Sequence, residues 1–232
     1  MHPILSNKIK LLFGVLVLAM NLSAQSNLEQ YDNKVLHFGF TLSTNSGRLQ
    51  INRNTSAFAM DTLKSVNQTA FPGIGLGAIT NLHLGSNFDL RLLFPSISFV
   101  QRNLNYQFEN SKKTTEIESA YCDASLLLKF KSDRRKNVRV YVIGGLRASY
   151  DLASTTDQDR SVTKPVVSLN AFTTGYEFGA GLDVYFEYFK FSPEIKFCNS
   201  FNSAMYKDGY IYTDLLQGLT PQLVQISLHF EG

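Results

Sequence analysis

Apolar and polar residues alternate one by one over many stretches of the chain after residue 25, and no long stretch shows the i, i+3, i+4 spacing of an amphipathic helix. Such period-two patterning predicts β-strands with one apolar and one polar face. The phase slips near Pro95, where we expect a β-bulge. Eight stretches follow the pattern: 37–43, 73–84, 89–94, 121–130, 138–152, 172–186, 189–197 and 224–230.

The connections between these stretches alternate between short and long. The long ones are 44–70, 107–116, 153–170 and 203–219. Alternating polarity alone also fits a soluble sandwich, but tight periplasmic turns that alternate with long external loops are typical of outer-membrane barrels. We therefore predict an all-β fold, an eight-stranded antiparallel up-and-down transmembrane β-barrel over residues 35–232. Its apolar face is expected to point into lipid, and both termini to lie in the periplasm.

The N-terminal residues are typical of a secretory signal. Lys8 and Lys10 precede an apolar segment, residues 11–20, that is too short to span a bilayer, and Ala24 supplies a small residue at a cleavage site. We expect residues 1–24 to be removed and residues 25–34 to form a short periplasmic segment before a barrel in the cell outer membrane. An uncleaved anchor is the alternative, which the length of the apolar segment disfavours.

The polar faces of the predicted strands carry acids and bases in similar numbers, together with glycines that leave room for long side chains. Eight strands enclose an interior just wide enough for side chains, so we expect a filled polar core with paired charges instead of an open pore. Catalytic carboxylates are the alternative. The predicted lumen charge network consists of Arg91, Asp123, Lys129, Arg139, Arg147, Asp151, Glu177, Asp183, Glu194 and Lys196.

Composition excludes some function classes. The formal charge is +3, and without Lys8 and Lys10 the remainder holds 20 bases and 19 acids. The basic run 131–136 falls in a predicted turn, so no nucleic-acid partner is expected. Cys122 and Cys198 are predicted on opposite faces of strands that are not neighbours, so both thiols should be free. No motif indicates a cofactor or a small-molecule substrate.

Several stretches, in order across nearly the whole mature chain, are similar to the PorT family of Bacteroidetes outer-membrane barrels. They are Tyr31-Asp32-Asn33-Lys34 with His37-Phe38-Gly39-Phe40, Gln101–Tyr106, Leu126–Ser132, Tyr141–Gly145, Ser149–Ser154 and Tyr188–Phe197. The residues 121–125 depart from the family, which has bulkier apolar residues, a Glu and a Pro there. This leaves open whether the chain is the secretion component itself or a paralogue. The resemblance implies a component of the type IX secretion system, which exports protein cargo and is linked to gliding motility. It implies other secretion-system proteins as partners and no catalytic residues.

Three histidines fall on the inward phase near the predicted periplasmic ends of the first, second and last strands: His37, His83 and His229. Since a closed barrel places the first strand between the other two, one interpretation is that the three imidazoles come together as metal ligands. The alternative is that they hydrogen-bond to Glu231, Asp89 and the backbone at a wet rim, and this alternative is favoured because only spacing and phase support a metal site.

The last long connection is the most apolar of the external loops. Its side chains either pack on one another or dock a partner protein. The residues concerned are Tyr206, Tyr210, Ile211, Tyr212, Leu215 and Leu216.

The preferred function from these observations is a non-catalytic component of the type IX secretion apparatus, embedded among outer-membrane lipid and lipopolysaccharide. A generic small surface barrel for adhesion or envelope integrity is the alternative. A lipid-modifying barrel enzyme is less well supported, because there is no GxSxG motif and the histidines lie at the end opposite to the outer rim.

Overall fold

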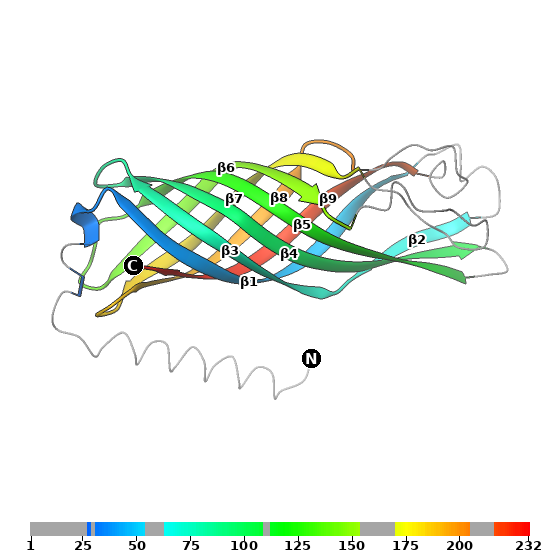
Figure 1. Cartoon of the computed structure of the whole chain (residues 1–232). Coiled ribbons are helices and arrows are strands. Elements are labelled where there is room, and N and C mark those ends of the chain that lie inside the picture. Colours follow the sequence, from blue (N-terminus) through cyan, green and yellow to red (C-terminus); the bar gives the residue numbers. More distant parts are fainter. Residues whose placement is uncertain (1–26, 29–30, 54–62, 109–111, 154–169, 205–215) are drawn as a thin grey trace, which may run out of the picture.

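The protein is a closed β-barrel, shown in Figure 1 as a computed structural model that describes residues 27–28, 31–53, 63–108, 112–153, 170–204 and 216–232. The expected signal peptide, 1–24, lies outside the described residues. One turn of 3-10 helix, η1 (Tyr31–Asn33), precedes the first strand. Among the described residues, no helix has both the length and the apolar character needed to cross a membrane. The strands are β1 (Leu36–Arg53), β2 (Leu63–Ala70), β3 (Pro72–His83), β4 (Phe88–Phe108), β5 (Lys112–Lys131), β6 (Val138–Asp151), β7 (Phe172–Tyr185), β8 (Lys190–Ser200) and β9 (Leu216–Glu231).

Neighbouring strands are antiparallel throughout, and the sheet closes on itself. The hydrogen-bonded order is β2-β4-β3-β1-β9-β8-β7-β6-β5, and a further pairing of β4 with β5 completes the ring. The first strand, β1, pairs with the last, β9. Closure gives each spanning strand a hydrogen-bonding neighbour on both sides, which the hydrocarbon of a bilayer demands. The prediction of an eight-stranded up-and-down barrel is confirmed.

The strand β2 is the element that the sequence pattern missed. It falls within the stretch 44–70 that we expected to be a loop, and it pairs with the outer part of β4, from Ala70↔Arg102 to Leu63↔Phe108. The strand β3 pairs with the inner part of the same strand. Thus β2 continues the line of β3 past a break at Phe71, and the barrel still has eight strands around it.

The strands are longer than predicted at one end of the barrel. β1, β4 and β5 contain 18, 21 and 20 residues, whereas a tilted strand needs only ~9–11 residues to cross a bilayer. The expected loops 44–70 and 107–116 are therefore largely strand, and Leu216 begins β9 instead of lying in a loop. In Figure 1 these strands extend beyond the main body of the barrel.

The two ends of the barrel differ. One end, which we call the turn end, holds η1, the C-terminus and the short connections β3–β4, β5–β6 and β7–β8 (Figure 1). The opposite end, which we call the loop end, holds the long connections and the strand extensions. The predicted alternation of short and long connections holds only in part. The segments between β1 and β2, β6 and β7, and β8 and β9 are longer than those at the turn end, but only residues 109–111 separate β4 from β5, fewer than the six residues between β5 and β6.

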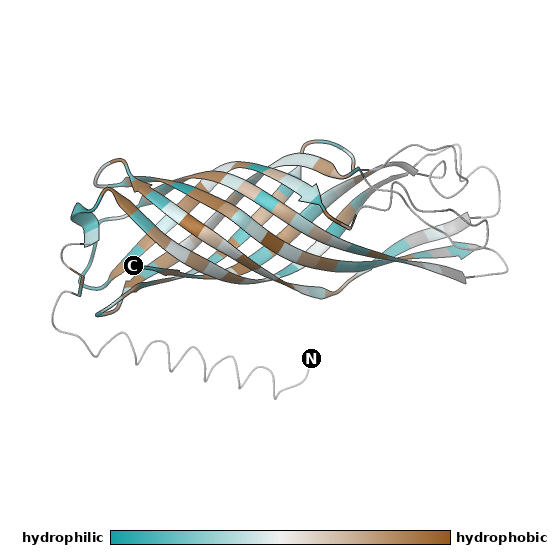
Figure 2. Ribbon diagram, in the orientation of Figure 1, coloured by the Kyte–Doolittle hydropathy of each residue, from teal (hydrophilic) through white to brown (hydrophobic). Residues whose placement is uncertain are grey.

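The outer surface of the barrel is apolar. Brown apolar residues alternate with teal polar residues along every strand in Figure 2, and large apolar side chains such as Phe38 and Ile74 expose 61% and 68% of their surface. Burying such a surface against a second sheet would have produced a sandwich. Since the sheet closes into one ring with the apolar side chains outside, the solvent that suits this surface is lipid.

The alternation breaks once along β4, where the bulge was predicted. Phe94 and Pro95 are both exposed although they are consecutive, and the pairing of β4 with β5 shifts between Leu93 and Ser96. The pairing with β3 shifts at the same place. The bulge resets the phase so that Ile97 and Phe99 face outward again, which keeps the apolar surface continuous.

Candidate functional site: the filled interior of the barrel

A fully buried arginine organises the middle of the interior. Arg91 on β4 donates to Glu194 on β8 at 2.7 Å and to Asn81 on β3 at 3.0 Å, and its second terminal nitrogen lies 3.4 Å from Glu231 on β9. The Tyr141 hydroxyl on β6 donates to the same Glu194 carboxylate at 2.7 Å. These groups link five strands across the lumen, so they fix the shape of the barrel as well as neutralising charge.

A second ion pair lies beside this hub. The Lys129 ammonium on β5 donates to both carboxylate oxygens of Asp183 on β7, at 2.8 and 2.7 Å. Ser192 on β8 donates to the same carboxylate at 2.6 Å, and the lysine nitrogen also lies 3.7 Å from the centre of the Tyr141 ring. Both charged side chains are completely buried, so each depends on the other for its stability.

A third cluster follows toward the loop end. Arg147 on β6 pairs with Asp123 at 2.8 Å and lies 3.5 Å from Glu177. Lys196 on β8 pairs with Glu177 at 2.8 Å, and Ser125 donates to Glu177 at 3.2 Å. Each of the three clusters thus pairs charges of opposite sign, and in the third cluster the sign alternates from strand to strand between β5 and β8.

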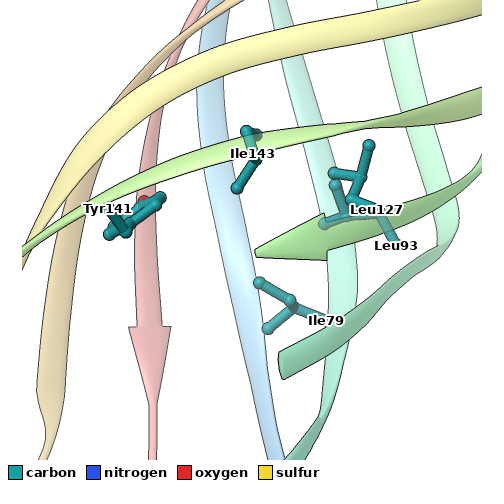
Figure 3. Close-up of a cluster of buried hydrophobic side chains, with 5 residues drawn as sticks. All are labelled: Ile79, Leu93, Leu127, Tyr141 and Ile143. Atoms are coloured by element: carbon teal, nitrogen blue, oxygen red, sulfur yellow. The ribbon is translucent and has the colours of Figure 1, made fainter. Parts of the chain in front are cut away.

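Apolar side chains occupy part of the interior, which the sequence analysis did not anticipate. Ile79, Leu93, Leu127 and Ile143 point inward from β3 to β6 and pack with Tyr141 (Figure 3). A second buried cluster, Val100, Tyr121, Cys198 and Leu223, lies toward the loop end. These clusters occupy much of the space beside the charged groups, so the lumen is closely filled by side chains.

Most of the predicted lumen network is brought together. Arg91, Asp123, Lys129, Arg147, Glu177, Asp183, Glu194 and Lys196 form ion pairs with one another.

Two members of the predicted network differ. Arg139 pairs instead with Asp32 in the N-terminal segment, at 3.1 Å. Asp151 contacts no base among the described residues and accepts hydrogen bonds from the backbone of Ala120 and Ala153. Asp151 is the last residue of β6. At the end of a strand, its carboxylate can accept hydrogen bonds from nearby backbone N–H groups.

Further members of the network were missed. Lys190 pairs with Glu231 at 3.0 Å, and Lys131 pairs with Asp89 at 2.7 Å. Asp89 and Lys190 lie inside the predicted stretches 89–94 and 189–197, and Lys131 and Glu231 directly follow the stretches 121–130 and 224–230 on the same phase. The alternation therefore indicates the inward face of all four residues but not which of them pair.

The N-terminal segment closes the turn end of the interior. We call residues 27–28 and 31–34 the N-terminal cap. Tyr31 is 5% exposed, its ring stacks on His37 at 3.8 Å, and its hydroxyl donates to Glu231 at 3.2 Å. Burial raises the pKa of the Tyr31 hydroxyl well above its usual range, and the charge of Glu231 raises it further. The tyrosine therefore stays neutral and acts as a hydrogen-bond donor.

Polar contacts at the rim hold the cap in place. Asp32 lies 3.1 Å from Arg139 and 3.5 Å from Arg134. Arg134 also donates to the backbone carbonyl of Asn27 and stacks over the Tyr185 ring at 3.9 Å. The basic turn of residues 131–136 thus holds the N-terminal cap on the barrel through Arg134.

The three candidate histidines are separated by their contacts and do not form a metal site. His37 stacks on Tyr31, His83 lies 2.8 Å from Asp89 and 3.2 Å from Lys131, and His229 lies 3.2 Å from Glu194. Within the described ranges, no three His, Cys, Asp or Glu side chains are placed to hold a metal ion. The neighbour of each ring comes from a different element: Tyr31 from η1, Asp89 from the paired position on β4, and Glu194 from β8.

One lane of the interior carries polar atoms without a protein partner. Along β1 and β9 these atoms are His37 Nδ1, Thr41 Oγ1, both side-chain polar atoms of Asn45, Ser227 Oγ and His229 Nδ1. A cavity of about 10 Å³ adjoins the lane and is lined in part by Thr41 and Ser227. A volume of that size holds on the order of one water molecule. The lane therefore has room for isolated water, and the cavity is far too small for a solute.

Two further expectations concern the cysteines and the aromatic loop. Cys122 and Cys198 are free thiols, as predicted. The loop candidates Tyr206, Tyr210, Ile211, Tyr212 and Leu215 lie outside the described residues.

Substitutions at Tyr31 are expected to separate its two roles in the cap. Tyr31→Ala removes both the stacking on His37 and the bond to Glu231, so the cap should detach and its amides should exchange with solvent much faster. Tyr31→Phe keeps the stacked ring and should raise the exchange rate only slightly. Hydrogen exchange measured by mass spectrometry on peptides covering residues 27–34 checks this. Equal exchange in the wild type and Tyr31→Ala would contradict the assigned role.

Comparison with solved structures finds outer-membrane proteins of low sequence identity. The solved structures that resemble this chain include OprG of Pseudomonas aeruginosa (10% identity, TM-score 0.47, 85% of this chain and 94% of that chain covered). They also include the attachment invasion locus protein Ail of Yersinia pestis (11% identity, TM-score 0.44, 86% and 100% covered). The N-terminal barrel domain of OprF of Pseudomonas aeruginosa is a third (14% identity, TM-score 0.33, 82% and 96% covered). Comparison with curated proteins gives no match.

The family comparison covers most of the chain. The sequence profile described as "Outer membrane protein beta-barrel domain" matches residues 23–206, which include β1 to β8 and the whole charged interior except the contributions of β9. Together with the closed barrel and its lipid-facing apolar surface, this match places the protein in the outer membrane. The chain belongs to the outer membrane protein β-barrel domain family.

Proposed function

We propose that this protein is a non-catalytic barrel that acts through protein contacts at its two ends, as a component of the type IX protein secretion system. The observation that carries the non-catalytic part is the filled interior. Ion pairs and apolar side chains occupy the lumen, and the polar cavity beside His229 measures only about 10 Å³. A lumen packed in this way has no room for a substrate, so function falls to the ends of the barrel.

The specific role in type IX secretion is supported by the residue stretches that are similar to the PorT family. Two features of the ends support contact with other proteins. At the loop end, β4 and β5 extend as a long paired hairpin, from Gln101↔Glu118 to Gln107↔Lys112. At the turn end, the N-terminal cap presents an ordered surface. We place the turn end in the periplasm, because short turns face that side in this class of barrel.

A deletion strain tests the secretion role. Without this protein, type IX cargo should accumulate in the periplasm while envelope integrity, measured as resistance to detergent, stays normal. The protein should also co-purify with other secretion-system proteins from native membranes. Normal export of cargo in the deletion strain would overturn the proposal.

A lumen variant provides the matched control. Replacing the buried pair with Lys129→Met and Asp183→Asn changes only the interior, so this variant should restore export to the deletion strain if contacts at the ends do the work. Failure of a folded lumen variant to restore export would contradict a role confined to the ends.

Adhesion is the second candidate function, and the strand extensions favour it because they carry the loop end beyond the apolar surface of the barrel. Under this alternative, the deletion strain would export cargo normally but attach poorly to surfaces.

A further inference from the structure

An amphipathic groove lies on the outer surface of β7, β8, β9 and β1. It has a volume of about 460 Å³. The part of the groove nearer the turn end is apolar and is formed by Phe178, Phe197 and Val224. These three side chains are 48%, 40% and 41% exposed, and the two rings stack with centroids 5.5 Å apart. They belong to one cross-strand row, because Phe178 pairs with Phe197 and Phe197 with Val224.

The next row toward the loop end is polar. It runs through Asn199, Gln222 and Arg48, since Asn199 pairs with Gln222 and Gln222 with Arg48. Arg48 is exposed, and no carboxylate of a described residue lies within ion-pair distance of it. Gln222 is held by a hydrogen bond to Gln50 at 3.1 Å. On β8, β9 and β1 the surface therefore changes from apolar to polar and basic within one row of residues. On β7 the same row continues as the exposed Tyr176, which pairs with Asn199, and aromatic residues beside polar ones are typical of the interface of such barrels.

We propose that this groove binds the phosphorylated headgroup of lipopolysaccharide, with the Arg48 guanidinium on a phosphate and an acyl chain along Phe178, Phe197 and Val224. A guanidinium matches phosphate oxygens in charge and geometry. The apolar row on its turn-end side offers a hydrophobic surface for an acyl chain. Lipopolysaccharide is the lipid chosen because the row with Arg48 lies on the loop-end side of the apolar row. This choice rests on the proposed orientation with the loop end outside.

A second groove of similar size provides an internal comparison. It lies across β3, β4 and β5, with Ile74 and Phe99 in its apolar part and a volume of about 460 Å³. Its polar edge carries Gln101 and the exposed acid Glu118 in place of a base. An anionic headgroup would be repelled there, so charge distinguishes two grooves that are otherwise alike in size and position.

Binding of lipid A to the purified barrel in neutral detergent tests the proposal, with native mass spectrometry or fluorescence titration as the measurement. Arg48→Gln is expected to weaken lipid A binding about tenfold, as the loss of one charge-assisted contact implies. Arg48→Lys should weaken it less, because a point charge remains. The control Glu118→Gln should leave the affinity unchanged. Both positions are exposed, so neither substitution should affect folding.

The probes distinguish the sources of the phosphate. Dephosphorylated lipid A should bind the wild type as weakly as lipid A binds Arg48→Gln. Equal affinity of the wild type and Arg48→Gln for lipid A would overturn the site. Phosphatidylglycerol that binds as tightly as lipid A, and with the same dependence on Arg48, would overturn the choice of lipopolysaccharide and the orientation behind it. Neither result would bear on the secretion role, which the deletion strain tests separately.

Discussion

Lys129→Met is expected to destabilise the folded barrel by about 3–5 kcal/mol, the cost of leaving a buried carboxylate without its partner. Asp183 would lose both bonds from the Lys129 ammonium, at 2.8 and 2.7 Å, and would keep only the bond from Ser192. Lipid surrounds the barrel at this level and offers no water to replace the lost partner. Urea unfolding of the protein in lipid vesicles or detergent, followed by circular dichroism, measures the change in the free energy of unfolding.

The double variant Lys129→Met with Asp183→Asn is the control for this prediction. The asparagine oxygen still accepts the hydrogen bond from Ser192, and no unpaired charge remains. We expect most of the lost stability to return, because replacing a whole buried pair costs far less than breaking it. If the single and double variants were equally unstable, the ion pair would not be what stabilises this part of the lumen.

Gly145→Ala is expected to destabilise the barrel by about 2–3 kcal/mol or to prevent its assembly, the upper range for forcing extra volume into a packed site. A Cβ built on Gly145 would overlap the backbone oxygen of Leu126 and would lie 2.8 Å from the Cα of Leu127. The obstacle is backbone of the neighbouring strand, which cannot rotate away as a side chain can. β5 and β6 would have to separate where Leu127 pairs with Gly145.

The adjacent glycine provides the control. A Cβ on Gly144 would meet only the oxygen of Glu177, at 3.8 Å, so Gly144→Ala should leave stability nearly unchanged. Folding yield from urea into vesicles and the urea midpoint measure both variants. Comparable losses at the two positions would show that backbone freedom, and not the close approach of β5, explains the glycine pair.

The filled lumen also bears on how the protein can work. Charge clusters around Arg91, Lys129 and Arg147 join strands that are far apart in the sequence, and the N-terminal cap seals the turn end through Tyr31. A barrel stabilised across its whole section is a stiff support, so its ends are presented in fixed positions. Such a stiff barrel with a filled lumen is better suited to assembling with other proteins than to conducting solutes or catalysing a reaction.

The sequence by itself determined the topology, the faces and most of the lumen charges. Alternation along 138–152 and the spacing of turns are local properties of the chain, and they are enough to predict a closed ring with Phe38 outside and Arg91 inside. The bulge at Pro95 was equally local, because proline and the slipped phase coincide there.

Only the tertiary structure decided which groups meet. The partner of Arg139 is Asp32, from a segment with no strand pattern, and the three histidines point to different neighbours although their phase is the same. The strand β2 forms because an extended β4 offers it an edge, not because residues 63–70 alternate in polarity. Such contacts depend on which strands face each other across the ring and how far each strand continues. Period-two patterning encodes the face of a residue but carries no information about the residue opposite.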